Sequence, residues 1–145
     1  MTSRRSARLL EPAVSALRKS IEEAGMLRAP GLPVQVSRAL IYVHRHAFEP
    51  GLNAAAVRAG CGMRNHNLTT LFRRALGATL RDYIEGIRLE AAERLLRTVP
   101  AEAFLIAAAV GYDSYETFCR AFRRRFGCTP RALRVQVDPA DPEQS

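Results

Sequence analysis

Hydrophobic side chains recur every three or four residues along most of this chain, which is the spacing of one face of an α-helix. Interruptions by glycine and proline divide the pattern into helices predicted over 12–24, 36–48, 53–60, 64–77, 80–98, 101–109 and 115–126, with a last helical turn in 129–134. No stretch competes with the strict alternation of a half-buried β-strand. The chain is therefore predicted to be all-α.

Several helix ends are marked by residues with known end preferences. Pro12 suits the first turn of a helix, and Gly25 suits the stop of that same helix. The side chain of Asn53 can accept a bond from a backbone N–H and so cap the helix that follows it. Gly77 is predicted to end a later helix, and Pro130 to stand at the first position of the last turn.

Two segments of the chain repeat one another at an offset of 50 residues, namely "LFRRALGATLRDY" in 71–83 and "AFRRRFGCTPRAL" in 121–133. In each copy a short helix leads through a glycine turn into an amphipathic helix, which is the order of a helix-turn-helix unit. The sequence predicts two such units, over about 53–77 and 101–127, joined by a long linker helix over 80–98. The identical pairs are Phe72/Phe122, Arg73/Arg123, Arg74/Arg124, Gly77/Gly127, Thr79/Thr129 and Arg81/Arg131.

Helical periodicity gives the longer helix of each unit an apolar face and a polar face. Hydrogen-bonding side chains near the start of an outward face, followed by arginines, can reach base edges in a DNA major groove. For a single helix of this kind, the alternative is a polar face that is only solvated. Because the same polar face occurs on two helices, a binding role is favoured. The predicted inward residues are Leu68, Leu71, Phe72, Leu76, Phe118, Ala121, Phe122 and Phe126. The predicted outward residues are His66, Thr69, Thr70, Arg73, Glu116, Thr117, Arg120 and Arg124.

The charge of the chain is concentrated in its central part. The net charge is +8, and residues 34–134 alone hold 16 arginines and 8 acidic residues, a difference of +8. A basic domain suits an anionic polymer, with nucleic acid as the leading candidate. A surface that is only solvated remains the alternative from charge alone.

Candidate catalytic and metal-binding residues are sparse. Cys61, Cys119 and Cys128 have no C-x-x-C spacing, so neither a disulfide framework nor a zinc site is expected. His44 and His46 stand two apart and would point in different directions on a helix, and we predict no metal and no cofactor. No apolar run reaches the roughly 20 residues that span a bilayer, and none follows the basic N-terminus as a secretory signal would. We expect a cytoplasmic protein without a membrane partner.

The second repeat carries a longer motif, "IAAAVGYDSYETFCRAFRRRFGCTPRALR" in 106–134. It resembles the pattern of the AraC/XylS-type transcription regulators, which have I-A, then V-G-F/Y, then F-x-R-x-F-[KR]-[KR], then G-x-[ST]-P-x-x-[YLF]-R. The segment "RLEAAERLL" in 88–96 is similar to that family's R-L-x-x-A-x-x-L-L. The resemblance covers about residues 36–134 and implies two homeodomain-like three-helix bundles of a bacterial DNA-binding domain.

This resemblance implies sequence-specific binding of double-stranded DNA, with two recognition helices in successive major grooves about 10 base pairs apart. Such a protein would bind promoter DNA as a monomer, would have RNA polymerase as a partner and would not be an enzyme. Arg120 is the leading base reader, because arginine can bind a guanine edge with two hydrogen bonds. By position in the motif, the base-contacting residues are predicted to be His66, Thr69, Thr70, Glu116, Thr117 and Arg120. The predicted phosphate-contacting residues are Arg73, Arg124 and Arg131.

The first unit departs from the family pattern at three positions. The family commonly has a small residue where Arg58 stands, a Ser or Thr cap where Arg64 stands, and often an arginine where Thr70 stands. Arg64 offers no acceptor for a capping bond, and Thr70 can touch a thymine methyl group but cannot bind guanine in a bidentate manner. Base reading is therefore expected mainly from the second unit, with backbone contacts from the first.

Three segments are predicted along the chain: an extension with one short helix in 1–33, the DNA-binding domain in 34–134 and a disordered tail in 135–145. The extension is too short for an ordinary sensor domain, so the chain resembles stand-alone family members. A DNA-binding fragment of a larger sensor regulator is the alternative. A protein-interaction module on the same scaffold would bind DNA weakly and independently of salt. A cysteine alkyl-transfer protein would need a histidine and an acid beside a cysteine, which the sequence does not supply.

Overall fold

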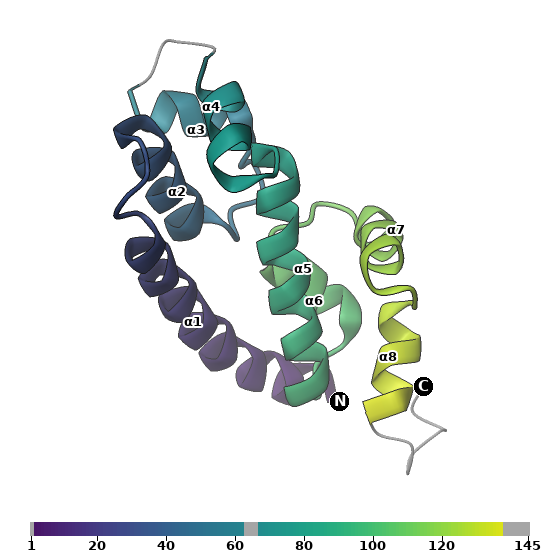
Figure 1. Cartoon of the computed structure of the whole chain (residues 1–145). Helices are drawn as coiled ribbons and strands as arrows, with labels where there is room; N and C mark the ends of the chain where they lie inside the picture. Colours follow the sequence, from purple (N-terminus) through teal and green to yellow (C-terminus); the bar gives the residue numbers. More distant parts are fainter. Residues whose placement is uncertain (1, 63–66, 138–145) are drawn as a thin grey trace. The chain divides into compact units, whose positions relative to one another are not determined.

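The computed structural model describes residues 2–62 and 67–137, which Figure 1 traces from the N-terminal helix to the C-terminal one. Within these ranges the chain forms eight α-helices and no strand, which confirms the all-α prediction. The helices are α1 (Thr2–Arg28), α2 (Val34–His46), α3 (Ala54–Gly60), α4 (Asn67–Leu76), α5 (Leu80–Thr98), α6 (Ala103–Ala109), α7 (Tyr115–Phe126) and α8 (Pro130–Val137).

The chain divides into two compact units. The first unit is Ala16–Arg88 and contains α2, α3 and α4. The second unit consists of Met1–Ser15 and Leu89–Ser145 and contains α6, α7 and α8. The helices α1 and α5 contribute residues to both units. Each unit thus holds one of the predicted helix-turn-helix pairs, α3 with α4 and α6 with α7.

The main buried cluster of the first unit is aliphatic apart from Phe72. Helix α2 packs against both α3 and α4, which lie beside it in Figure 1. The predicted inward face of α4 is confirmed for Leu68 and Phe72, which are buried, whereas Leu71 and Leu76 are half-buried at its margin. The buried residues of this core are Ala29, Val36, Ala39, Leu40, Val43, Leu52, Val57, Leu68, Phe72, Leu80 and Ile84.

The core of the second unit is rich in aromatic rings. Phe118 and Phe122 of α7 are fully buried with ring centroids 5.6 Å apart, and Phe126 lies 4.6 Å from Phe122. Tyr112 meets Phe118 edge to face at 5.3 Å. Such pairs add about 0.5–1.5 kcal/mol each beyond the area they bury. The predicted inward face is confirmed for Phe118, Ala121 and Phe122, and Phe126 is half-buried.

Side-chain caps start the helices α3 and α7. The Asn53 carboxamide oxygen accepts from the backbone N–H of Ala56 at 2.8 Å, which confirms the predicted cap. The Ser114 hydroxyl accepts from the N–H of Thr117 at 3.3 Å in the same way. Each bond satisfies one of the N–H groups that a helix start leaves without a partner.

Both recognition helices are followed by the same backbone turn. Gly77 and Gly127 each have φ +76°, the left-handed conformation that favours glycine after a helix, which confirms the predicted end at Gly77. Two residues later, the hydroxyl oxygens of Thr79 and Thr129 each accept from the backbone N–H three residues further on, at 3.1 Å in both cases. The sequence repeat therefore corresponds to a structural repeat of the turn and of the capped helix start.

Two arginines hold the ends of other helices. Arg88 on α5 donates from Nε to the carbonyl oxygen of Ala47 at 2.8 Å and from Nη2 to that of Glu49 at 2.6 Å, just past the end of α2. Arg134 on α8 donates in the same two-pronged way to carbonyl oxygens at the end of α5, at 2.9 and 3.1 Å. Carbonyls at a helix end lack partners within the helix, so these bonds satisfy them. Both arginines thus serve the fold.

His44 of α2 connects three helices within the first unit. It is only 5 % exposed, and its Nδ1 lies 2.8 Å from the carbonyl oxygen of Ile21 in α1, so that Nδ1 carries the donated proton. Its Nε2 then accepts from the Tyr83 hydroxyl of α5 at 2.6 Å. That hydroxyl also accepts from Arg28 at 3.0 Å, and the Tyr83 ring meets Phe72 of α4 edge to face at 5.4 Å. This set of contacts, the His44 network, connects α1 to the recognition helix of the first unit.

Burial lowers the pKa of the His44 imidazole below its ordinary value of 6.5, against the opposing effect of the bond to the Ile21 carbonyl. The guanidinium of Arg28 lowers this pKa further. The ring is therefore neutral at pH 7, which fits an imidazole that donates from one nitrogen and accepts at the other.

The prediction of a short N-terminal helix over 12–24 is wrong, because α1 extends over Thr2–Arg28. Good helix formers such as Arg8 and Leu9 precede Pro12, which lies inside the helix and removes one backbone hydrogen bond without ending it. Gly25 is also inside α1 and is not its stop. A Cβ atom at Gly25 would lie 2.5 Å from the Cβ of His44, so glycine here allows α1 to approach α2 closely.

The remaining boundaries differ from the predictions by a few residues. The helices over 80–98 and 115–126 are confirmed at both ends as α5 and α7. The start predicted for α4 at residue 64 falls in 63–66, outside the described residues. The prediction of a disordered tail is wrong for 135–137, because α8 continues to Val137. The rest of that tail, 138–145, is also outside the described residues.

Candidate nucleic-acid interface

The outer surface of α4 carries short polar side chains and arginine. Thr70 and Arg73 are exposed, and Thr69 is half-buried, while Leu68 and Phe72 on the other side are buried. The predicted outward orientation is therefore confirmed for Thr70 and Arg73. His66, the remaining predicted base reader of this helix, lies outside the described residues.

The outer surface of α7 is exposed along its whole length. Glu116, Thr117, Arg120 and Arg124 are all exposed, which confirms their predicted orientation. The opposite side of the same helix is buried and carries the aromatic side chains Phe118 and Phe122 of the second core. Arg131, at the second position of α8, is exposed as well.

Two of the exposed residues on α7 approach one another. Arg120 Nη2 lies 4.0 Å from Glu116 Oε1, with side-chain exposures of 71 % and 81 %. An ion pair at this distance in solvent contributes little, because water screens it. The guanidinium of Arg120 is therefore only weakly held by Glu116 and remains accessible to other partners.

The arginines of the chain divide into those engaged by the fold and those on the outward surfaces. Arg125 pairs with Glu90 at 2.6 Å, although it directly follows the exposed Arg124 in sequence. Arg88 and Arg134 are bound to helix-end carbonyls, and burial lowers the pKa of the Arg134 guanidinium. Sequence reasoning did not identify these structural roles, because the partners stand 35 or more residues away.

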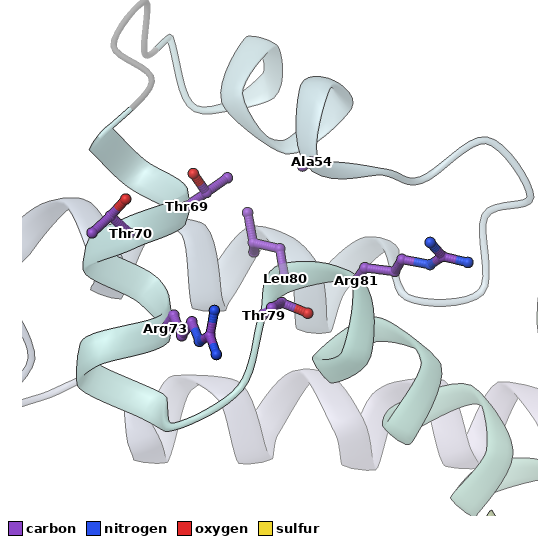
Figure 2. Close-up of a pocket in the computed structure, with 7 residues that line it drawn as sticks. All are labelled: Ala54, Thr69, Thr70, Arg73, Thr79, Leu80 and Arg81. Carbon is purple, nitrogen blue, oxygen red and sulfur yellow. The ribbon is translucent and has the colours of Figure 1, made fainter. Parts of the chain in front are cut away.

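A surface pocket of about 340 Å³ lies beside α4 in the first unit. Figure 2 shows that Arg73 projects from α4 toward Thr79, whereas Arg81 points away from α4 at the start of α5. Arg81 was not among the predicted site residues, although its repeat partner Arg131 was. The lining residues are Ala54, Thr69, Thr70, Arg73, Thr79, Leu80 and Arg81.

Cys61, Cys119 and Cys128 are half-buried free thiols. Burial raises the pKa of the Cys61 thiol, which opposes formation of a nucleophilic thiolate at neutral pH. Its sulfur donates to the backbone carbonyl of Arg38 at 3.7 Å. Within 2–62 and 67–137, no three His, Cys, Asp or Glu residues gather closely enough to hold a metal ion. None of the helices described is long and apolar enough to cross a membrane.

Comparison with known proteins identifies relatives of this domain. A family model for a helix-turn-helix domain matches residues 57–136. Regulatory protein SoxS of Escherichia coli (strain K12) is 38% identical over 98 residues, which cover 68% of this chain and 91% of SoxS. The xylose operon regulatory protein of the same strain is 27% identical over 127 residues, covering 88% of this chain and 31% of that protein.

Solved structures share the fold. The C-terminal domain of AraT, a response regulator from Geobacillus stearothermophilus, matches with a TM-score of 0.70 at 27% identity and covers 73% of this chain and 88% of that one. A transcriptional regulator from Chromobacterium violaceum, with an AraC-type DNA-binding domain, matches with a TM-score of 0.60 at 26% identity and covers 72% and 92%.

The two capped helix pairs with exposed polar faces define a DNA-binding protein of the tandem helix-turn-helix class. The chain belongs to the AraC/XylS-type family of helix-turn-helix transcriptional regulators, as the family model and SoxS show. The resemblance seen in the sequence motif is thereby confirmed.

Proposed function

We propose that this chain regulates transcription by inserting α4 and α7 into successive major grooves on one face of double-stranded DNA. One observation carries the proposal: in both units, the helix after the turn exposes polar and basic side chains on one face and buries phenylalanine on the other. Such a helix can present side chains to base edges while its rigid support fixes their direction.

The two helices take different parts in this scheme. Arg120 reads guanine through two hydrogen bonds, and Glu116 orients it before binding and accepts from a neighbouring cytosine amino group. Thr117 contacts the adjacent base. In α4, Thr70 and Thr69 touch thymine methyl groups, with His66 as a further base contact.

Arginines on the margins of these surfaces position the protein on the DNA. Arg73, Arg124 and Arg131 contact phosphates, which fixes the register of the helices in the grooves without reading sequence. We further propose that the chain binds as a monomer, since it carries two recognition helices of its own, and that it acts on RNA polymerase at promoters.

Substitution of Arg120 provides the test. After selection of bound sequences from a random duplex pool, Arg120→Ala should weaken binding to the selected site by about 1–3 kcal/mol and leave non-specific binding nearly unchanged. Arg120→Lys keeps the charge but loses the two-pronged geometry, so it should lose nearly as much specificity. Fluorescence anisotropy with selected and scrambled duplexes measures the specific and the non-specific affinity of each variant.

Arg97→Ala is the matched control, because Arg97 is an exposed arginine of α5 outside both recognition helices. An equal loss on selected and scrambled duplexes for Arg120→Ala would contradict base reading. Binding that is weak and independent of salt in the unmodified protein would favour a protein-interaction module on this scaffold.

A second candidate is the DNA-binding part of a larger sensor regulator. The matched region makes up 31% of the xylose operon regulatory protein but 91% of SoxS, so the family uses this domain both with and without a large additional part. The length of the native transcript and the mass of the protein in cells distinguish the two candidates.

A further inference from the structure

We propose that the C-terminal half of α1, residues 16–28, controls the first recognition helix through two positioning residues, His44 and Tyr83. When α1 is seated on α2, α4 is held in the orientation that enters the groove. When α1 is displaced, the first unit loses its contacts with DNA and the second unit keeps its own. The inference deepens the proposed function and rests on it. The family model begins at residue 57, so α1 lies outside the matched region.

The contacts of α1 in the first unit come from one face of the helix. Ile21, Gly25 and Arg28 recur at spacings of four and three residues, which places them on the same side of α1. The Ile21 carbonyl accepts from His44 of α2 at 2.8 Å. Arg28 donates from Nη1 to the Tyr83 hydroxyl of α5 at 3.0 Å, and its guanidinium carbon lies 5.7 Å from the centroid of that ring. This face is thus connected to α2 and α5 by directional contacts.

Tyr83 connects this face of α1 to α4. It lies in the first turn of α5, directly after the turn that follows α4. Its hydroxyl is bonded to His44 Nε2 at 2.6 Å, and its ring meets Phe72 edge to face at 5.4 Å. Phe72 is fully buried and precedes the exposed Arg73 on α4. Because a protein core is densely packed, a shift of the Tyr83 ring displaces Phe72 and, with it, the outward side chains of α4.

The internal repeat indicates that the turn after a recognition helix does not need the Tyr83 hydroxyl. At the offset of 50 residues, Tyr83 corresponds to Leu133. Leu133 is 3 % exposed and follows the same glycine turn and threonine cap. A side chain without any hydrogen-bonding group therefore fills this position in the second unit. The hydroxyl in the first unit serves the connection to α1.

The polar contacts of the His44 network fix an arrangement more than they add stability. Burial of an imidazole and a hydroxyl is unfavourable, and their hydrogen bonds offset most of that cost. Because these bonds have defined directions, a satisfied network favours one placement of its members. The His44 network thus favours one placement of α1 relative to Tyr83 and Phe72.

The seating of residues 16–28 on the first unit is weak enough to be reversible. None of these residues belongs to the main buried cluster of the unit or to the half-buried hydrophobic residues packed against that cluster. Leu17 and Ile21 are only half-buried. The ion pair between Glu22 and Arg45 is exposed, so water screens it. Elements with few buried apolar contacts open at low free-energy cost, and regulated motions use such elements.

The test measures how much the first unit adds to DNA binding by the full chain. Two duplexes are compared: the selected site, and a shortened duplex that retains only the half whose binding is weakened by Arg120→Ala. The ratio of the two affinities, the first-unit gain, reports the contribution of the first unit. Tyr83→Phe keeps the ring against Phe72 but removes the hydroxyl. It should lower the first-unit gain by about fivefold, at the lower end of typical coupling between sites, and leave the affinity for the shortened duplex unchanged.

A second variant acts from the other end of the network. A Cβ atom at Gly25 would lie 2.5 Å from the Cβ of His44, so Gly25→Ala should displace α1 and lower the first-unit gain in the same way. Gly51→Ala is its matched control, because an added Cβ there meets no other part of the chain within 4 Å. Tyr42→Phe is the control for Tyr83→Phe, since it removes a hydroxyl of the same unit that is outside the His44 network. Both controls should retain the gain of the unmodified protein.

Amide hydrogen exchange supplies a readout that a loss of stability alone would not produce. Binding free energies are reciprocal, so DNA that is bound more tightly when α1 is seated must favour the seating of α1 to the same extent. Exchange in residues 21–28 should therefore slow by about fivefold when the unmodified protein binds the full site, and should not change with the shortened duplex. In Tyr83→Phe, the difference between the two duplexes should disappear.

All affinities are measured at a temperature where circular dichroism shows each variant to be folded, so that unfolded protein does not lower them. If either Tyr83→Phe or Gly25→Ala retains the first-unit gain, the proposal is overturned. Equal losses on both duplexes would also overturn it, because the effect would then not be confined to the first unit. Failure of the proposed function looks different, because the unmodified protein would then not prefer the selected site at all.

Discussion

The two helix-turn-helix units share the same turns but differ in what supports and what covers their recognition helices. Both have a left-handed glycine after the recognition helix, followed by a threonine cap. The buried side of α7 carries a cluster of aromatic rings, and its exposed side carries Arg120. The buried side of α4 carries Phe72, whose ring contacts Tyr83 of the His44 network. The exposed side of α4 carries Thr70, which lines a pocket that also contains two arginines.

This difference suggests a division of labour between similar scaffolds. Both units have the same turn and cap, formed in the first unit by Gly77 and Thr79. The exposed side chains of their recognition helices nevertheless differ between the two units. In the proposed complex the second unit reads bases through Arg120. In the proposed complex the first unit mainly contacts the DNA backbone. Its recognition helix is connected to α1 through Phe72, Tyr83 and His44.

The largest expected effect comes from removing the ring behind each recognition helix. Phe72→Ala and Phe122→Ala should each destabilise the protein by about 3–5 kcal/mol, because both rings are fully buried. Urea unfolding followed by circular dichroism measures the loss. Phe122 has aromatic neighbours on both sides, so its substitution should be the more damaging of the two.

Phe72→Leu and Phe122→Leu are the conservative controls, which should retain most of the stability. A loss below about 1 kcal/mol for either alanine variant would contradict the assignment of these rings to the two cores.

An intermediate effect is expected at His44, which has no counterpart in the second unit. The unfolded chain binds the proton more tightly than the folded protein, because the pKa is lowered on folding. The stability contributed by the neutral imidazole is therefore present above pH 6.5 and is lost as the pH falls below that value. The free energy of unfolding should decline more steeply between pH 7 and 5 in the unmodified protein than in His44→Gln, as urea titrations at each pH would measure.

Replacement of the same residue by alanine at neutral pH should destabilise the protein by about 1–3 kcal/mol, since it leaves the Ile21 carbonyl and the Tyr83 hydroxyl without this partner. His46→Gln is the matched control, because that ring is half-buried and pairs with Glu49 close in sequence. Parallel pH profiles for the unmodified protein and His44→Gln would refute the role of His44.

The smallest effects should come from the helix caps, one in each unit. Asn53→Ala and Ser114→Ala should each destabilise the protein by about 1 kcal/mol, with the larger loss at Asn53, whose bond is shorter at 2.8 Å against 3.3 Å. Thermal unfolding detects such changes. Asn53→Asp and Ser114→Thr retain an acceptor and should be nearly neutral, and an equal loss in these variants would argue against capping.

Much of the fold could be predicted from local sequence patterns. The errors occur where contacts between residues far apart in the sequence determine the structure. The periodicity of 80–98 and 115–126 fixed both ends of α5 and α7, because caps and breakers stand at those ends. Gly25 was misread as a stop, since its reason is the approach of His44, which is 19 residues further along the chain. Arg88 and Arg134 bind carbonyls that no local pattern connects to them.

The candidate site was predictable in its orientation but not in its full extent. Helical period alone places Thr70, Arg73 and Arg120 on outward faces, and the structure confirms this. The pocket beside α4 could not be predicted, because its lining comes from α3, α4 and the start of α5, which only the tertiary fold brings together. Base contacts themselves stay predictions, because they depend on the DNA.

The close seating of α1 on α2 has a consequence for where an autonomous DNA-binding fragment can begin. The family match starts at residue 57, and residues 29–33 form the loop between α1 and α2. Removal of α1 by truncation at this loop would therefore leave the matched region intact. A fragment cut there would leave the His44 ring facing water on the side that Gly25 and the Ile21 carbonyl now cover. The smallest piece that keeps α4 in its native setting therefore begins within α1, ahead of Ile21.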